Sequence, residues 1–253
     1  EYVEAAEPSL IARLLGDGRQ SFVALLSELR KAERDDRIAV VVLRVRDLEI
    51  GWAKAQELRA ALRELSEHGR RVIAYLETTE LGANIEYYVA TAADEIRAAP
   101  ATRSPVIGLA AEYVFLGGLW EKLGVDVEVE KVGEFKGAAE TLSEREMSSA
   151  NREMANALLD SIDTQFVAGI AEGRKLEPAF VRRAIDEAPV SPQQSKALNL
   201  IDGIQFWDEL VADLGGKEKW VDAADYARVD PRTLGFAPLE RFALIYGSGN
   251  VVV

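Results

Sequence analysis

The sequence predicts an α/β fold, because apolar runs that suit buried strands alternate with segments that have helical spacing. Residues 38–45 (IAVVVLRV) form a continuous β-branched stretch, as expected for a strand buried on both faces of a parallel sheet. Residues 72–76 (VIAYL) have the same character. Between them, residues 52–66 carry apolar side chains at helical spacing. We therefore expect a parallel sheet with right-handed crossovers.

The alternation continues along the chain and then gives way to a helical C-terminal part. Residues 125–132 (VDVEVEKV) alternate apolar and polar side chains with a period of two, which predicts a half-exposed strand. The other predicted elements are a strand at 95–99 and helices at 22–29, 84–93, 113–123, 149–172, 177–188, 191–198 and 204–214.

The domain organisation follows from composition. Residues 1–219 carry the α/β pattern and its helical end, which predicts one folded region. Residues 220–241 are charged and contain prolines, which is typical of a linker. Residues 242–253 begin with a new apolar run, FALIY, which predicts a further buried strand.

Composition excludes several classes of function. With 43 acidic and 30 basic residues, the net charge of −13 argues against nucleic acid and anionic lipid as partners. The absence of cysteine excludes disulfides, thiolate zinc sites and cysteine nucleophiles. The single histidine, His68, precedes Gly69 and is typical of a capped helix end. Acid–base catalysis would therefore use a carboxylate, a tyrosine or a lysine, and we expect no metal and no cofactor.

An ordered set of segments carries a resemblance to a known family. The segments are EYYVATAADEI at 86–96, LWEKLGV at 119–125, VGEFKGAAE at 132–140 and KALNLIDG at 196–203. Together they resemble the signal peptide peptidase A family in its long form with two homologous halves, over roughly residues 9–214. The resemblance implies the Clp protease/crotonase-like fold, a spiral of β-β-α units with a helical C-terminal part. It also implies that residues 1–219 are the N-terminal peptidase half and that residues 242–253 are the first strand of a truncated second half.

The resemblance also implies a catalytic residue. In this family the lysine that follows Val-Gly-x-aromatic is the general base, and here that position is Lys136. Family members commonly continue with a serine and then a proline–phenylalanine pair, where this chain has Gly137, Thr141 and Leu142. The chain therefore keeps the lysine but lacks the serine that commonly supports it with a hydrogen bond.

The nucleophilic serine is missing from its place. In single-half relatives it opens the helix after the second strand, where this chain reads LGANIE at residues 81–86. Ser104 precedes a proline and is interpreted as a turn residue, and Ser248 follows a predicted strand and is interpreted as structural. In long-form members the second half supplies the serine, which is the division that this chain matches.

The family implies that the protein is half of a Ser–Lys endopeptidase that degrades cleaved signal peptides and other unfolded apolar peptides. It also implies partnership with the second half, assembly into a homo-oligomer, and a place at the periplasmic face of the bacterial inner membrane. No run of the chain reaches the roughly 18 apolar residues of a membrane span, so we expect the anchor to lie outside this sequence.

Two alternatives stay open at this stage. The chain could be a non-catalytic scaffold or gating half of the same oligomer, which the changes after Lys136 favour. A crotonase-type acyl-coenzyme A enzyme is the other alternative, in which Glu77 or Glu86 would stabilise an enolate.

Overall fold

The computed structural model describes residues 21–79, 82–103, 105–130 and 132–236, and it divides into two compact units. The described parts of residues 1–106 and 187–253 form unit 1. Residues 107–186 form unit 2, which is inserted between the two segments of unit 1. The predicted strand at the start of residues 242–253 lies outside the described residues.

Unit 1 contains a four-stranded sheet with the order β1-β2-β3-β4, in which all neighbouring strands are parallel. Val40 lies opposite Arg71, Ile73 opposite Glu95, and Ala98 opposite Ile204. The predicted α/β class with a parallel sheet is confirmed. The strands are β1 (Val40–Val45), β2 (Arg71–Leu76), β3 (Glu95–Ala98) and the short β4 (Gly203–Ile204).

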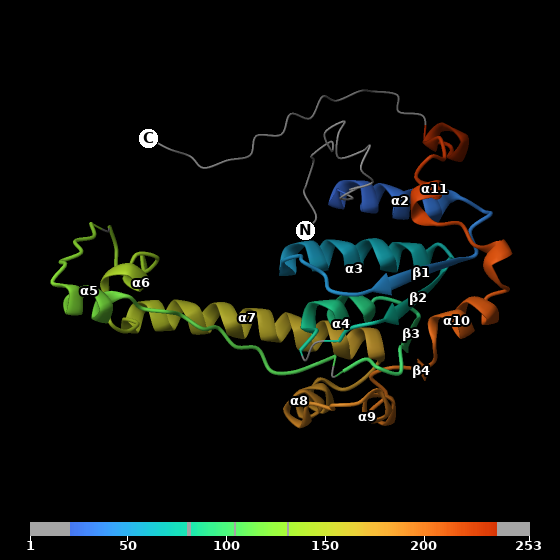
Figure 1. Cartoon of the computed structure of the whole chain (residues 1–253). Helices are drawn as coiled ribbons and strands as arrows, with labels where there is room; N and C mark the ends of the chain where they lie inside the picture. The colour runs from blue at the N-terminus through green and yellow to red at the C-terminus, as the bar shows by residue number, and fades with distance from the viewer. Residues whose placement is uncertain (1–20, 80–81, 104, 131, 237–253) are drawn as a thin grey trace. The chain divides into compact units, whose positions relative to one another are not determined.

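Three helices build the core of unit 1 with this sheet. Helices α3 (Trp52–Glu67) and α4 (Asn84–Ala90) pack against β2 and against each other, and α2 (Phe22–Arg34) packs on α3 (Figure 1). The buried face of α3 has the helical spacing seen in the sequence, with Leu58, Leu62 and Leu65 each at most 2% exposed. The sheet and α3 therefore share one apolar core.

A buried arginine ties α3 to α4. Arg59 is 4% exposed, and its guanidinium donates hydrogen bonds to the carbonyl of Tyr88 and to the hydroxyl of Thr91. The guanidinium also lies 4.1 Å from the centre of the Tyr88 ring, a cation–π contact. These contacts fix the orientation of α4 relative to α3.

The predicted end of α3 is confirmed. His68 is the C-cap residue, its Nδ1 lies 2.7 Å from the Glu64 carbonyl oxygen, and Gly69 follows with a φ of 80°. Its Nε2 lies 3.4 Å from a carboxylate oxygen of Glu33. His68 therefore ends a helix and packs beside α2, which is a structural role.

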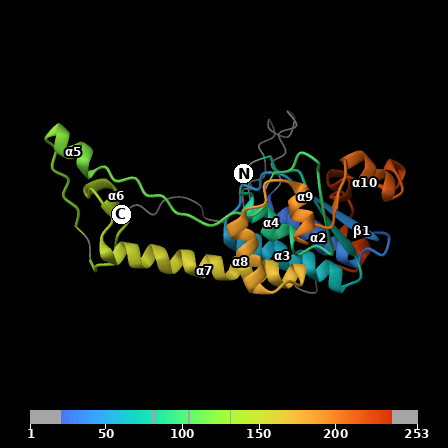
Figure 2. The same ribbon diagram turned by 90° about the horizontal axis from the view of Figure 1, so that it is seen from below.

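Unit 2 is built on one long helix. Helix α7 (Ser149–Arg174) is followed by α8 (Pro178–Glu187), and Arg182 pairs with Asp163 of α7 at 2.5 Å. The short helices α5 (Gly117–Leu123) and α6 (Glu140–Ser143) lie together near the beginning of α7 in both views (Figures 1 and 2).

Three sequence-based predictions need correction. Residues 125–130 are not a strand: they have no regular structure, and Val125, Val127 and Val129 are exposed. A period-two pattern makes a strand only when a neighbouring strand pairs with it, and the described part of unit 2 contains none. The predicted helix at 113–123 begins only at Gly117, and that at 204–214 begins only at Trp207, because Ile204 joins β4.

The C-terminal segment of unit 1 returns to the sheet. Trp207, the first residue of α10, lies 5.1 Å from the ring of Tyr75 and 4.5 Å from the guanidinium of Arg44, so α10 lies beside β1 and β2 (Figure 2). The elements of this segment are α9 (Pro192–Ala197), α10 (Trp207–Asp213), η1 (Lys217–Lys219), α11 (Ala223–Tyr226) and η2 (Pro231–Leu234).

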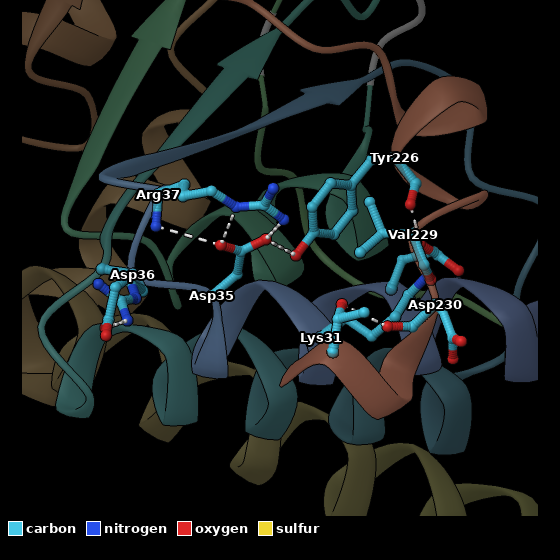
Figure 3. Close-up of polar contacts among 10 residues, drawn as sticks. Lys31, Asp35, Asp36, Arg37, Tyr226, Val229 and Asp230 are labelled. Carbon is cyan, nitrogen blue, oxygen red and sulfur yellow. Dashed lines mark hydrogen bonds and ion pairs between the residues drawn. The ribbon is translucent and has the colours of Figure 1, made fainter. Parts of the chain in front are cut away.

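Residues 220–236 include α11 and η2, and they are fastened to α2 by a buried lysine. The Lys31 ammonium donates hydrogen bonds to the carbonyl oxygens of Ala227 at 3.1 Å and of Tyr226 and Val229 at 3.4 Å (Figure 3). It also pairs with Glu28 at 2.8 Å. The ammonium therefore satisfies carbonyl groups at the end of α11 that have no partner within the helix.

A buried carboxylate makes a second contact between the end of α2 and residues 220–236, and the two contacts together are called the clasp. Asp35 is 2% exposed and accepts hydrogen bonds from Arg37 Nε at 2.8 Å, from Arg37 Nη2 at 2.7 Å and from the Tyr226 hydroxyl at 3.2 Å (Figure 3). The hydrogen bonds from Arg37 hold the pKa of Asp35 at about 2, below its ordinary 3.8. Burial raises the pKa of Tyr226, which keeps its hydroxyl a donor.

The clasp predicts a pH dependence of stability. Because the folded-state pKa of Asp35 is lowered, its contribution is fully present above its ordinary pKa and is lost as the pH falls from about 4 to about 2. We expect the free energy of unfolding, measured by urea denaturation, to fall less steeply across this range in Asp35→Asn than in the native chain. Asp36→Asn is the control, because Asp36 is 99% exposed. Equal slopes for Asp35→Asn and the native chain would contradict the assignment.

Candidate functional site

Lys136 lies in unit 2, on a turn between α5 and α6. Its backbone N–H donates to the carbonyl oxygen of Gly133 at 3.3 Å, and Gly133 has a φ of 92°, a conformation that favours glycine. The Lys136 side chain is exposed, and within the described part of the chain its ammonium group has no hydrogen-bond or ion-pair partner. The predicted site residue is therefore presented at the surface of this chain.

The turn is anchored by close contact between Gly137 and α7. A Cβ atom at position 137 would lie 2.5 Å from Cγ of Asn151, which is far inside van der Waals contact. Asn151 is 3% exposed, so its side chain has little room to withdraw. The serine that family members commonly carry after the lysine would not fit here without moving Asn151, which explains the glycine in physical terms.

A buried carboxylate completes the anchor. Glu140, the first residue of α6, is 3% exposed and accepts hydrogen bonds from the Ser148 hydroxyl at 2.8 Å, the Ser148 N–H at 3.2 Å and Asn151 Nδ2 at 3.2 Å. Ser148 is also the N-cap of α7, because its hydroxyl accepts from the Asn151 N–H at 3.2 Å. The backbone beside Lys136 is thus held through Gly137, Asn151 and Glu140.

Apolar side chains surround the lysine along the chain. Val132 is 90% exposed, Phe135 is 50% exposed and Leu142 is 52% exposed. Each lies within six residues of Lys136 in the sequence. Covering these apolar side chains with an apolar partner would be favourable, because it removes apolar surface from water.

Chemically, the arrangement can supply a proton acceptor once it is covered. A lysine acts as a base only in its neutral form, which burial and nearby positive charge favour. In this chain Lys136 is exposed, so that burial would have to come from outside the described residues. Among those residues, no group of three or more His, Cys, Asp and Glu side chains is arranged to hold a metal ion.

The place where single-half relatives carry the nucleophile has no hydroxyl group in residues 82–86. Helix α4 begins at Asn84, and its N-cap is Ala83, which makes no side-chain capping bond. Ser104 and Ser248 lie outside the described residues.

The two carboxylates considered for an acyl-coenzyme A enzyme are engaged in the structure. Glu86 accepts the N–H of Leu48 at 2.7 Å, which fastens the loop after β1 to α4. Glu77 accepts two hydrogen bonds from Arg44, and these lower its pKa. Both carboxylates therefore have structural partners, which disfavours their use as free catalytic groups.

Sequence reasoning proposed Lys136 as the site residue and assigned no role to Glu140 or Asn151. Glu140 is the last residue of the segment at 132–140. Its role could not be predicted from that segment, because its buried partners come from the start of α7. The pattern Ser148-x-x-Asn151 at the start of the long helix was the available signal, since a serine N-cap marks where the chain turns.

The contact at Gly137 gives a stability prediction. Gly137→Ala should lower the free energy of unfolding by about 1–3 kcal/mol, because the new methyl group overlaps buried Asn151. Gly108→Ala, also in unit 2, is the matched control, since a Cβ there meets nothing within 4 Å. Urea denaturation of both variants measures the difference, and an unchanged midpoint for Gly137→Ala would refute the tight contact.

Comparison with known proteins places the chain in a family. The profile of peptidase family S49 matches residues 64–222, which include Lys136, Glu140 and Asn151. The chain is 31% identical over 230 residues to "Serine protease SPPA, chloroplastic" of Arabidopsis thaliana, covering 87% of this chain and 34% of the relative. It is 26% identical over 185 residues to "Protease 4" of Salmonella typhi, covering 68% of this chain and 29% of the relative.

A solved structure was also similar: an enoyl-CoA hydratase/isomerase family protein from Silicibacter pomeroyi, at 18% identity and a TM-score of 0.38, covering 82% of this chain and 76% of that one. A TM-score this low does not establish a shared fold, so the α/β class is assigned from the parallel sheet of unit 1.

The fold and the matched profile define an α/β protein of a peptidase family. The chain belongs to peptidase family S49, as a member of the signal peptide peptidase A group. The predicted family is confirmed, and its long form with two homologous halves stays a prediction. The chain spans only about a third of the length of the first relatives it matches. Among the described residues, no helix combines the length and the apolar character needed to cross a membrane.

Proposed function

We propose that this chain is the lysine-bearing half of a Ser–Lys endopeptidase, in which Lys136 is the general base and a second half supplies the serine. The observation that carries the proposal is that an exposed lysine stands on a turn anchored by Gly137 and Glu140. An anchored turn fixes the backbone from which the lysine side chain extends, and a base must come within hydrogen-bond reach of its proton.

The proposed reaction begins when the serine Oγ attacks the peptide carbonyl carbon while Lys136 Nζ accepts the hydroxyl proton. The protonated lysine then gives this proton to the leaving amine as the C–N bond breaks, which leaves an acyl-enzyme ester. Lys136 next takes a proton from a water molecule that attacks the ester, and it returns the proton to the serine as the acid product departs. The lysine ends the cycle neutral, as it began.

We further propose that the substrates are cleaved signal peptides and other unfolded apolar peptides. The exposed apolar side chains of Val132, Phe135 and Leu142 beside the lysine support this choice, because burial of apolar surface favours binding of such segments. The second half would cover the remainder of this surface. Assembly into a homo-oligomer at the periplasmic face of the inner membrane is part of the same proposal and rests on the family.

The division of labour between two halves is tested by comparing two proteins. One is the 253-residue chain alone, and the other is the full-length gene product. We expect only the full-length protein to cleave an apolar peptide carrying a fluorophore and a quencher. Cleavage by the 253-residue chain alone would show that it holds its own nucleophile. Absence of cleavage by a folded full-length protein would favour the non-catalytic scaffold. The replacement by Gly137 of the serine that commonly follows the lysine would then be part of that loss of function.

A further inference from the structure

Strand β1 forms an open edge of the sheet in unit 1. The strand order places β1 at one end of the sheet and β4 at the other. β4 has only two residues, and a short edge strand is a common protection against unwanted pairing. β1 has six residues, and residues 38–45 contain no proline and only one charged side chain, Arg44, which is already paired with Glu77. The edge of β1 is therefore long and lacks the usual protection.

The hydrogen bonds to β2 show which backbone groups of β1 face the open edge. The Arg71 N–H donates to the Ala39 carbonyl oxygen at 3.1 Å, and the Glu77 N–H donates to the Val45 carbonyl oxygen at 2.9 Å. Because successive residues of a strand direct their backbone groups to opposite sides, the odd-numbered residues from 39 to 45 face β2. The residues that face outward are Val40, Val42 and Arg44. Within the described ranges, the outward N–H and C=O groups have no hydrogen-bond partner.

Apolar side chains accompany these backbone groups on both faces of the sheet. Residues 40–43 (VVVL) are only half-buried, whereas residues 72–76 of β2 are at most 1% exposed. The difference arises because β2 has a strand on each side and β1 has one on a single side. A second apolar strand along this edge would remove apolar surface from water and would give the outward backbone groups partners.

We propose that this strand is β1 of a second copy of the chain, which pairs in the antiparallel direction about a two-fold axis at Val42. In this register Val42 faces Val42 of the second copy, and Val40 faces Arg44 of the second copy. All three outward residues then have a facing partner, and each facing pair exchanges two hydrogen bonds, which gives six. A shift of two residues in either direction would leave one outward residue of each β1 strand without a partner in the other.

The side chains favour the same register. On one face of the sheet, Val41 would lie opposite Leu43 of the second copy, which is an apolar pair. Beyond the ends of the strand, the exposed Arg37 would lie opposite the exposed Asp47, so opposite charges meet at both ends. A register centred on Arg44 would instead set two arginines against each other. The proposed dimer rests on unit 1 alone and does not depend on the role of Lys136.

The oligomeric state of the 253-residue chain tests the proposal, measured by analytical ultracentrifugation. We expect a dimer that dissociates on dilution. Val42→Pro removes the outward N–H at the two-fold axis but no hydrogen bond to β2, and proline is accepted on the outer side of an edge strand. This variant loses two hydrogen bonds of the dimer, so dimerisation should weaken at least about tenfold while the far-UV circular dichroism stays unchanged.

Cysteine cross-linking gives a second measurement, which does not require a proline in the strand. The chain has no cysteine, so Val42→Cys introduces a single thiol in each copy. Facing residues of a hydrogen-bonded antiparallel pair have Cα atoms about 5.5 Å apart, within the range of a disulfide. We expect Val42→Cys to form a disulfide-linked dimer on mild oxidation. Val190→Cys is the matched control, because Val190 is 65% exposed in the same unit and lies away from β1 in the sequence.

Hydrogen exchange measured by NMR separates a second copy from any other cover of the edge. In the dimer, the amides of Val40 and Arg44 should exchange at least about tenfold more slowly than in the diluted monomer. Protection that is independent of protein concentration would show that the same chain covers the edge. Fast exchange of these amides at every concentration would show that the edge stays open. Either result, or equal cross-linking of Val42→Cys and Val190→Cys, would overturn the proposal.

Discussion

Replacing Lys136 by alanine should reduce the peptidase activity of the full-length protein by about 10³-fold or more while leaving its stability unchanged. Loss of a positioned general base commonly costs 10²–10⁴-fold, and loss of a base that activates a nucleophile lies at the upper end of that range. Stability should not change, because Lys136 is exposed and has no partner among the described residues.

An arginine at the same position separates a base from a mere positive charge. Lys136→Arg keeps the charge but cannot give up a proton, so it should be as inactive as Lys136→Ala. Lys122→Ala is the control, because Lys122 is an exposed lysine of nearby α5. Activity is measured as kcat/KM on a quenched fluorescent apolar peptide. Substantial activity in Lys136→Arg would mean that the residue acts through its charge, and activity in Lys136→Ala would mean that it is not the base.

The second large effect is expected at Gly117. A Cβ atom there would lie 2.4 Å from the carbonyl carbon and 2.5 Å from the carbonyl oxygen of Glu144. Both are backbone atoms, which cannot swing aside as the end of a side chain can. The two backbone segments are also joined by a hydrogen bond, which the Gly117 N–H donates to the Glu144 carbonyl oxygen at 2.9 Å. Gly117→Ala should therefore separate α5 from α6 and destabilise unit 2 by about 3 kcal/mol.

The neighbouring glycine gives a matched comparison. A Cβ at Gly118 meets nothing within 4 Å, and Gly118 also lies in α5, so Gly118→Ala should be neutral or stabilising by up to about 1 kcal/mol. Trp120 reports on the contact directly, because its Nε1 donates to the Leu142 carbonyl oxygen at 2.8 Å. Tryptophan fluorescence and hydrogen exchange at α5 measure the effect. Equal behaviour of the two variants would show that α5 does not approach α6 this closely.

The elements of unit 1 could be predicted from the sequence because their local patterns and their environment agree. The β-branched runs at β1 and β2 are buried in a parallel sheet, and the apolar spacing of α3 faces that sheet. The residues at 125–130 could not be placed in the same way. Their alternation is a local property, whereas a strand also requires a partner that lies elsewhere in the chain.

The candidate site shows the same limit. Lys136 could be proposed as the site residue because its motif is contiguous in sequence. The partners that anchor its turn could not, since Glu140 meets Ser148 and Asn151 only after α6 has folded back on α7. The clasp between α2 and residues 226–229 joins residues that are even further apart in the sequence, because Lys31 and Ala227 are separated by 196 positions. Such contacts depend on topology rather than on any local spacing.

The inserted arrangement of unit 2 has a consequence for biosynthesis. The last strand of the sheet, β4, is translated only after all of residues 107–186, while its partner β3 is already complete at Ala98. During this interval the open edge of β3 offers unpaired backbone groups to any other extended chain, which is a known route to aggregation. The nascent protein therefore passes through a stage in which chaperone protection of that edge would matter most, and the stage ends when Gly203 and Ile204 emerge.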